Sequence, residues 1–337
     1  MNGTWQRRTA ALLEVLGVFL TGPILMYEVR RLLGLALPNP LDRLTAQASN
    51  TELVIASRQL FAILLFSNAG YYVLAVPLNW WYRRRRPADY GLTKAGHTWT
   101  ILLLAGLGAA ALSEWPVVGI TLANSIHPNP TVPWRQALMD MSMQRWQYWL
   151  FTGVLSWAGA PFFEELFFRG YCQRRLAEDW GDGPAIFGAA CLFTFRHNQY
   201  FRADPYNVGM ISGLLLSAIG FGVVFAWTRS LIPAMIAHAV FDIPLAPVWE
   251  GVLLAGLVIG AVVTGRRAIP IVKKVFAAGR LSACVALGVI GAAYSIVASR
   301  DELLIYLAAI MMLGLAVVLE VKERPRMRAA DVLTPSR

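Results

Sequence analysis

The sequence predicts an all-α fold: a polytopic bundle of roughly eight to ten transmembrane helices, with a functional site between helices. Apolar residues make up 57% of the 337 residues, and the mean hydropathy is +0.51. Charged residues make up only 15%, against about 25% in soluble domains. The apolar residues also form long blocks with the charges between them, so lipid must solvate much of the surface.

The lengths of these apolar blocks define the predicted spans. A helix needs about 20 apolar residues to cross the hydrocarbon core of a bilayer. The candidate spans are residues 10–28, 58–82, 98–120, 147–170, 184–200, 208–228, 231–249, 251–265, 281–298 and 303–321. Residues 231–264 hold either two short spans joined near Glu250, or one span and a re-entrant piece.

Basic residues gather at the ends of the apolar blocks. Lys and Arg number 30 against 20 Asp and Glu, which gives a formal net charge of +10. On a soluble chain this excess would suggest nucleic acid, but its placement follows the positive-inside rule, so we expect no nucleic-acid partner. We expect a prokaryotic cell membrane, with both termini cytoplasmic. Four cations fall on the opposite side: Arg30, Arg31, Arg196 and Arg202.

The chain reads as one membrane domain, residues 1–322, with a motif-bearing core at about 147–245. The proline-rich stretch 123–145 is predicted to be an extracytoplasmic loop with a short interfacial helix. The polar tail 323–337 is predicted to be cytoplasmic and disordered. The three cysteines, Cys172, Cys191 and Cys284, show no C-x-x-C spacing and are expected to be packing residues.

A few ionisable residues interrupt the apolar blocks. Asp, Lys or Arg at the centre of a span costs about 2.5–3.5 kcal/mol on insertion scales, so each needs a reason. The set comprises Glu14, Glu164, Glu165, Arg169, His197, His238 and Asp242. Glu14 lies alone near the end of a span and is expected to be a tolerated interfacial residue.

Glu164 and Glu165 form a carboxylate pair between phenylalanines. Adjacent helical residues point about 100° apart, so the two carboxylates should face different neighbours. Glu165 and Arg169 are four residues apart and can pair on one helix face, which leaves Glu164 free for acid–base chemistry. The alternative is a structural ion pair, with Arg169 reaching toward the membrane interface.

Two of the four histidines lie in apolar segments. His238 and Asp242 are four residues apart and should share a helix face. An intramembrane histidine–carboxylate pair marks a proton path, a metal site or a catalytic site, whereas a lone histidine is more often a packing residue. His197 falls near the far end of its span and Glu164 near the cytoplasmic end of its own, so the sequence does not reconcile their depths.

Three ordered motifs resemble those of the CPBP family, the CAAX protease and bacteriocin-processing (Abi) proteases, which includes the type II CAAX prenyl proteases. The motifs are Glu164-Glu165-x-x-x-Arg169, Phe193-x-x-x-His197 and His238-x-x-x-Asp242. They cover about residues 150–245, under a third of the chain.

The resemblance implies an intramembrane endopeptidase that acts on a membrane-tethered peptide, such as a prenylated C-terminus or a leader-bearing precursor. Glu164 and His197 would activate a water, while His238 and Asp242 would stabilise the oxyanion. Family members carry Asn or Asp at the fourth position. An ionised Asp242 would repel an oxyanion, so it would either orient His238 or be protonated.

Other interpretations stay open. Glu164, His197, His238 and Asp242 are also a plausible zinc set, although no H-E-x-x-H motif is present. We favour no cofactor, with zinc as the alternative. A non-proteolytic scaffold, chaperone or immunity protein of the same fold would use the same bundle. An ion-coupled transporter is less favoured, because the chain shows no inverted repeat.

Overall fold

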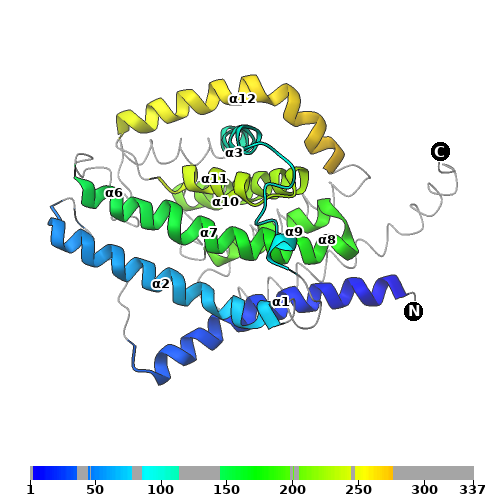
Figure 1. The fold of residues 1–337 in the computed structure, drawn as a ribbon, viewed down its shortest axis with the longest axis horizontal. Helices are drawn as coiled ribbons and strands as arrows, with labels where there is room; N and C mark the ends of the chain where they lie inside the picture. Colours follow the sequence, from blue (N-terminus) through cyan, green and yellow to red (C-terminus); the bar gives the residue numbers. More distant parts are fainter. Residues whose placement is uncertain are drawn as a thin grey trace.

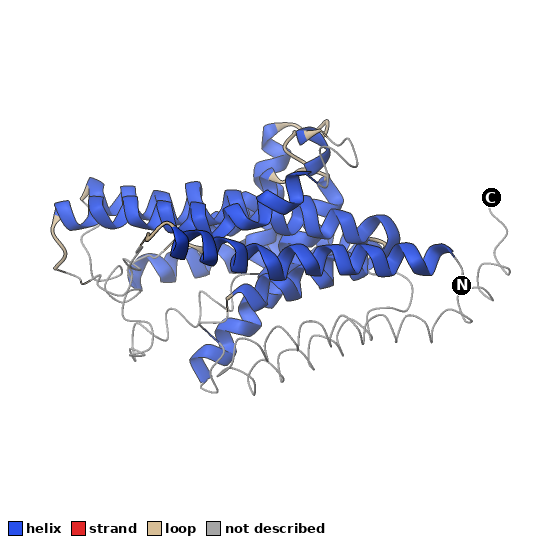
Figure 2. Ribbon diagram, turned by 90° about the horizontal axis from the view of Figure 1, so that it is seen from below, coloured by secondary structure: helices blue, strands red, loops and turns tan. Residues whose placement is uncertain are grey.

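A computed structural model of the chain describes residues 3–35, 45, 47–77, 86–113, 145–197, 200, 205–243 and 247–275. Every regular element in these ranges is a helix (Figure 2), which confirms the all-α class. Four predictions lie outside the described residues: the loop up to residue 144, the spans at 281–298 and 303–321, and the tail.

Two long helices open the chain and cross each other closely. They are α1 (Gly3–Leu32) and α2 (Asn50–Pro77). A Cβ atom on Gly70 would lie 2.0 Å from the carbonyl oxygen of Gly22, so only glycine permits this crossing. Helix α2 begins earlier than the predicted residue 58. Ser49 and Glu52 form a capping box there, because each backbone N–H donates to the other's side chain.

One unbroken helical run extends from Trp146 to Trp180, beyond the predicted span 147–170. It consists of α6 (Trp146–Gly153), η4 (Val154–Gly159), α7 (Ala160–Glu165), η5 (Leu166–Gln173) and α8 (Arg174–Trp180). Segments η4 and η5 are π-helical. Such wide turns change which face a helix presents and occur often at functional sites. Here they flank the Glu164–Glu165 pair.

The remaining helices complete the bundle. They are η3 (Pro87–Tyr90), α3 (Trp99–Ser113), α9 (Asp182–Arg196), α10 (Pro205–Thr228), α11 (Ile232–Phe241) and α12 (Pro247–Val275). The run packs against α1 and α2 on one side and against α9, α10 and α11 on the other (Figure 1). Helix α3 packs in turn against α10, α11 and α12. The motif-bearing helices therefore lie in the middle of the molecule.

Two helices of the described residues are long and apolar enough to cross a membrane: Asn50–Val73 and Gly209–Thr228. The larger number of spans stays a prediction. In the stretch 231–264, α11 has only 10 residues, too few to cross. The break between α11 and α12 precedes Pro247, so the expected junction near Glu250 is wrong.

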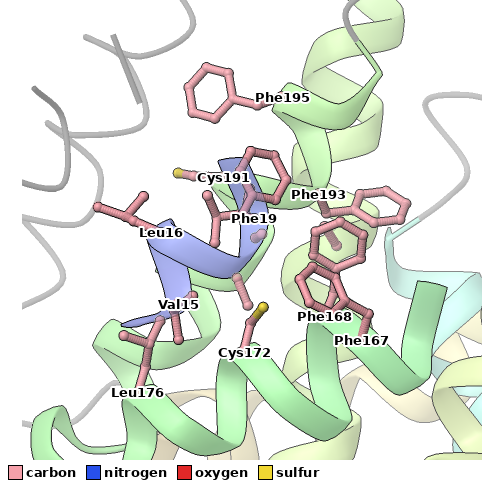
Figure 3. Close-up of a cluster of buried hydrophobic side chains, with 14 of the residues drawn as sticks. Val15, Leu16, Phe19, Phe167, Phe168, Cys172, Leu176, Cys191, Phe193 and Phe195 are labelled. Atoms are coloured by element: carbon pink, nitrogen blue, oxygen red, sulfur yellow. The ribbon is translucent and has the colours of Figure 1, made fainter. Parts of the chain in front are cut away.

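Aromatic side chains form the core beside the site. Phe168 from η5 packs against Phe19 of α1 and Phe193 of α9 (Figure 3). The neighbouring Phe167 stacks on Tyr71 of α2. The thiols of Cys172 and Cys191 are both buried in this cluster, which confirms their predicted packing role. Cys284 lies outside the described residues.

Glu14 is not alone, contrary to the sequence-based expectation. It accepts hydrogen bonds from Tyr171 Oη at 2.9 Å and from Arg175 Nε at 3.0 Å, which joins α1 to η5 and α8. Burial alone would lower the pKa of Arg175, but its hydrogen bonds to Asp179 and Glu14 raise that pKa above its ordinary value. The sequence missed these contacts because the partners are more than 150 residues away.

Candidate active site

Glu165 is the centre of a buried polar group. Its Oε1 atom accepts a hydrogen bond from Arg169 Nη1 at 2.9 Å and one from His238 Nδ1–H at 2.8 Å. The side chains of Glu165 and Arg169 are fully buried, and that of His238 is 1% exposed. The predicted ion pair between Glu165 and Arg169 is confirmed. Because Glu165 holds one ring nitrogen of His238, it also fixes the orientation of that ring.

Arg169 joins this group to α10. Its Nη2 atom donates to the carbonyl oxygen of Ala218 at 3.0 Å. The guanidinium also lies over the rings of Phe193 and Phe221, at 4.8 and 5.1 Å, which adds cation–π attraction. A buried charge requires such compensation. Arg169 therefore holds the fold around the site and does not reach the membrane interface.

Glu164 faces a different set of partners. Its Oε1 atom lies 3.5 Å from Arg196 Nε, and its Oε2 atom lies 3.9 Å from His197 Nε2. The residue is 4% exposed. Among the described residues Oε2 has no hydrogen-bond partner. One oxygen of a buried carboxylate is thus available to a small polar molecule between Glu164 and His197.

His197 presents one defined nitrogen to Glu164. Its Nδ1 atom lies 2.8 Å from the carbonyl oxygen of Phe193, and since a carbonyl only accepts, Nδ1 carries the hydrogen. In the neutral ring Nε2 then holds the lone pair. The side chain is 19% exposed. His197 can therefore accept a hydrogen bond through Nε2 on the side that faces Glu164.

A helical hairpin explains why Glu164 and His197 meet. Gly181, with φ +84°, ends α8 and begins α9, a backbone conformation that favours glycine. Glu164 precedes Gly181 by 17 residues and His197 follows it by 16, so the antiparallel helices bring them to the same level. At about 1.5 Å per residue, that level is about 25 Å from the turn. The structure thus brings Glu164 and His197 together, although the sequence left their depths unreconciled.

His238 and Asp242 complete the cluster from α11. The Nε2 atom of His238 lies 3.6 Å from Asp242 Oδ2. The ring of Phe193 contacts both histidines, with its centroid 4.7 Å from that of His197 and 5.4 Å from that of His238. His238 also interacts electrostatically with Glu164. All six predicted site residues therefore come together in the structure.

The sequence missed the contribution of α2. Arg196 Nη1 donates to Tyr71 Oη at 2.8 Å, and Arg196 Nη2 donates to Ser67 Oγ at 3.2 Å. Tyr72 Oη donates to the carbonyl oxygen of Phe163, beside Glu164. A sequence signal exists, because Ser67, Asn68, Tyr71 and Tyr72 form a polar group within the otherwise apolar residues 60–77 of α2.

The possible zinc ligands do not form one donor set. In the described parts of the chain, no three His, Cys, Asp or Glu side chains lie close enough to hold a metal ion. Glu164 pairs with His197, whereas His238 pairs with Glu165 and Asp242. This arrangement of the described side chains does not fit a zinc site.

Comparison with protein families gives a match to the motif-bearing part of the chain. Residues 145–244 match the family described as Type II CAAX prenyl endopeptidase Rce1-like. This segment is an Rce1-like domain of the CPBP/CAAX protease family. The family resemblance expected from the three motifs is confirmed, and all six candidate residues lie in the Rce1-like segment.

The family and the apolar helices together make the chain an integral membrane protein that carries a domain of a protease family. The Rce1-like segment covers under a third of the 337 residues, and α1, α2, α3 and α12 lie outside it. Searches of curated proteins and of solved structures gave no match.

Proposed function

We propose that this protein is an intramembrane endopeptidase that hydrolyses a peptide bond of a membrane-tethered substrate. One observation carries the proposal: Glu164 Oε2, buried and without a hydrogen-bond partner among the described residues, lies 3.9 Å from His197 Nε2. Polar groups at such a separation are commonly bridged by water. A water between them would donate one hydrogen to Glu164 and the other to His197.

The proposed reaction begins with this water. Its oxygen attacks the scissile carbonyl carbon while Glu164 takes one of its protons, and the carbonyl oxygen becomes an oxyanion. His197 Nε2 orients the water by accepting its second hydrogen. The tetrahedral intermediate then collapses: the C–N bond breaks, and Glu164 returns its proton to the leaving amine. The products are a carboxylic acid and an amine, and no co-reactant is consumed.

His238 is the proposed donor to the oxyanion. Glu165 holds Nδ1 of His238, and Nε2 of the same ring faces Asp242. We assign a second hydrogen to Nε2, so that the ring is an imidazolium whose Nε2–H donates to the developing charge in a buried, preorganised site. Because Glu165 already orients the ring, Asp242 is not needed for that task. We propose a protonated Asp242, whose O–H is a second donor, as an asparagine amide would be.

The proposed substrate class follows from the family. The matched family is described as a type II CAAX prenyl endopeptidase, so a prenylated C-terminal CAAX peptide is the first probe. A membrane-tethered precursor with a leader is the broader class. In both cases the lipid bilayer would present the substrate to the helix bundle.

The test compares cells that express the wild type, Glu164→Gln or Glu28→Gln. Glu28 pairs with Arg31 on the exposed face of α1, at 2.7 Å, so Glu28→Gln controls for charge loss alone. We expect at least one membrane precursor to accumulate only with Glu164→Gln, and the purified wild type to cleave a farnesylated CAAX peptide. Identical membrane proteomes and no peptide cleavage would favour a scaffold. Solute uptake driven by an ion gradient would favour a transporter.

A further inference from the structure

Arg196 connects the Glu164 carboxylate to α2. It is the last residue of α9, and its guanidinium makes three polar contacts. Nε lies 3.5 Å from Glu164 Oε1, Nη1 lies 2.8 Å from Tyr71 Oη, and Nη2 lies 3.2 Å from Ser67 Oγ. Every nitrogen of the guanidinium is thus directed to a defined oxygen.

The α2 side of this connection is firmly held. Tyr71 is 1% exposed, and its ring stacks on Phe167 with centroids 4.1 Å apart and on Phe19 at 6.1 Å. Arg196 also lies over the Tyr71 ring, 5.1 Å from its centroid, which adds cation–π attraction. Ser67 Oγ donates to the Leu64 carbonyl while it accepts from Arg196. The position of the guanidinium is therefore set by packed residues of α2.

The contact with Glu164 is longer than those with α2. Charge-assisted N–H···O bonds are typically about 2.7–2.9 Å, whereas Arg196 Nε and Glu164 Oε1 are 3.5 Å apart. A contact of this length attracts the carboxylate electrostatically but is not a full hydrogen bond. Oε1 faces Arg196, and Oε2 consequently faces His197. One guanidinium thereby decides which carboxylate oxygen is presented to the water.

We propose that Arg196, held by Tyr71 and Ser67, is a positioning residue that orients the Glu164 carboxylate toward His197. This inference rests on the proposed function. The inference also makes α2 part of the proposed active site, although α2 lies outside the Rce1-like segment 145–244. Arg196 itself touches neither the water nor the substrate, so its removal should slow the chemical step without weakening substrate binding.

The test measures kcat and KM on a farnesylated CAAX peptide for Arg196→Gln, Arg196→Lys and Tyr71→Phe. A misplacement of about 1 Å can cost about 100-fold in rate, so Arg196→Gln should lower kcat by about that factor. KM should stay within about two-fold, because only the transition state is affected. Arg196→Lys should recover part of kcat. Tyr71→Phe keeps the packed ring and loses the acceptor, so it should lower kcat by about ten-fold.

Tyr171→Phe is the matched control. The hydroxyl of Tyr171 also donates to a charged group, Glu14. Because Tyr171 lies toward the end of η5 that is far from Glu164, loss of this hydroxyl should not change kcat. A merely structural role for Arg196 would lower the yield of folded protein and leave kcat unaltered. Wild-type kcat in Arg196→Gln, or a raised KM with unchanged kcat, would overturn the inference.

A measurement of thermal stability, which needs no substrate, distinguishes failure of the positioning role from failure of the proposed peptidase function. In a double-mutant cycle on Tm, the shifts of Arg196→Gln and Glu164→Gln should be non-additive, because the residues interact. Additive shifts would overturn the positioning role. Wild-type activity in Glu164→Gln would overturn the proposed function instead. An inactive Glu164→Gln beside a fully active Arg196→Gln would overturn the further inference alone.

Discussion

Glu164 and Glu165 are adjacent in the chain, yet their carboxylates contact different partners. Glu164 faces Arg196 and His197, whereas Glu165 bonds Arg169 and His238. The angle of about 100° between successive helical residues separates the two carboxylates. The pair therefore divides two tasks: Glu165 holds the fold and orients a histidine, and Glu164 remains available for chemistry.

Loss of one partner of the Glu165–Arg169 pair should destabilise the protein strongly. In Glu165→Leu the fully buried guanidinium of Arg169 loses its carboxylate partner. Breaking one side of a buried ion pair costs about 3–5 kcal/mol, so we expect a large fall in Tm in detergent micelles. Glu165→Leu combined with Arg169→Met should recover part of this loss. A double variant no more stable than Glu165→Leu would argue against the pair as the cause.

Asp242 and His238 should respond differently to substitution. Asp242→Asn retains a hydrogen-bond donor, so cleavage should stay within about ten-fold of the wild type if Asp242 acts protonated. His238→Ala removes the imidazole N–H that is the main proposed donor to the oxyanion, so it should lower kcat about 100- to 1000-fold. Steady-state kinetics on the farnesylated peptide measure both. Equal losses in the two variants would contradict the assigned roles.

The crossing of α1 and α2 should depend on Gly70. A Cβ there would lie 2.0 Å from the Gly22 carbonyl oxygen, and backbone cannot move aside as a flexible side chain can. Gly70→Ala should therefore separate the helices and lower Tm. Gly17→Ala on α1 is the matched control, because a Cβ at Gly17 meets no atom within 4 Å. Equal Tm values for both variants would show that the crossing is not close.

Glu14 should matter for stability and not for catalysis. Glu14→Leu removes the acceptor of Tyr171 and Arg175, and hydrogen bonds that involve a charged group are each worth about 1.5–3 kcal/mol. We expect a lower Tm with an unchanged kcat for the folded fraction. An unaltered Tm would restore the interpretation of Glu14 as a tolerated interfacial residue.

Much of the candidate site could be predicted from local spacing. The pairs Glu165–Arg169 and His238–Asp242 are four residues apart, and helical geometry alone brings each pair together. The meeting of Glu164 and His197 depends on where the hairpin turns, which is set by Gly181 and not by the composition of either span. The contact of Glu165 with His238 joins residues 73 positions apart. The spacing of residues along a helix cannot predict a contact between residues so far apart in the sequence.

The boundaries of the fold were harder to predict than its class. Composition indicates helices in lipid but does not indicate where each helix ends. Capping by Ser49 and Glu52 starts α2 before its apolar block, and the π-helical turns change the register around Glu164. The sequence predicts only on which side of the membrane Arg196 lies, whereas the structure places its guanidinium 3.5 Å from Glu164.

The most direct test of the mechanism is a comparison of kcat for Glu164→Gln, His197→Gln and the double variant on a farnesylated CAAX peptide. If both residues act on one water, either single change removes nearly all of the catalysis. The mechanism therefore predicts that the double variant is no slower than the slower single variant. Losses that multiply in the double variant would show that Glu164 and His197 act independently, and would contradict the mechanism.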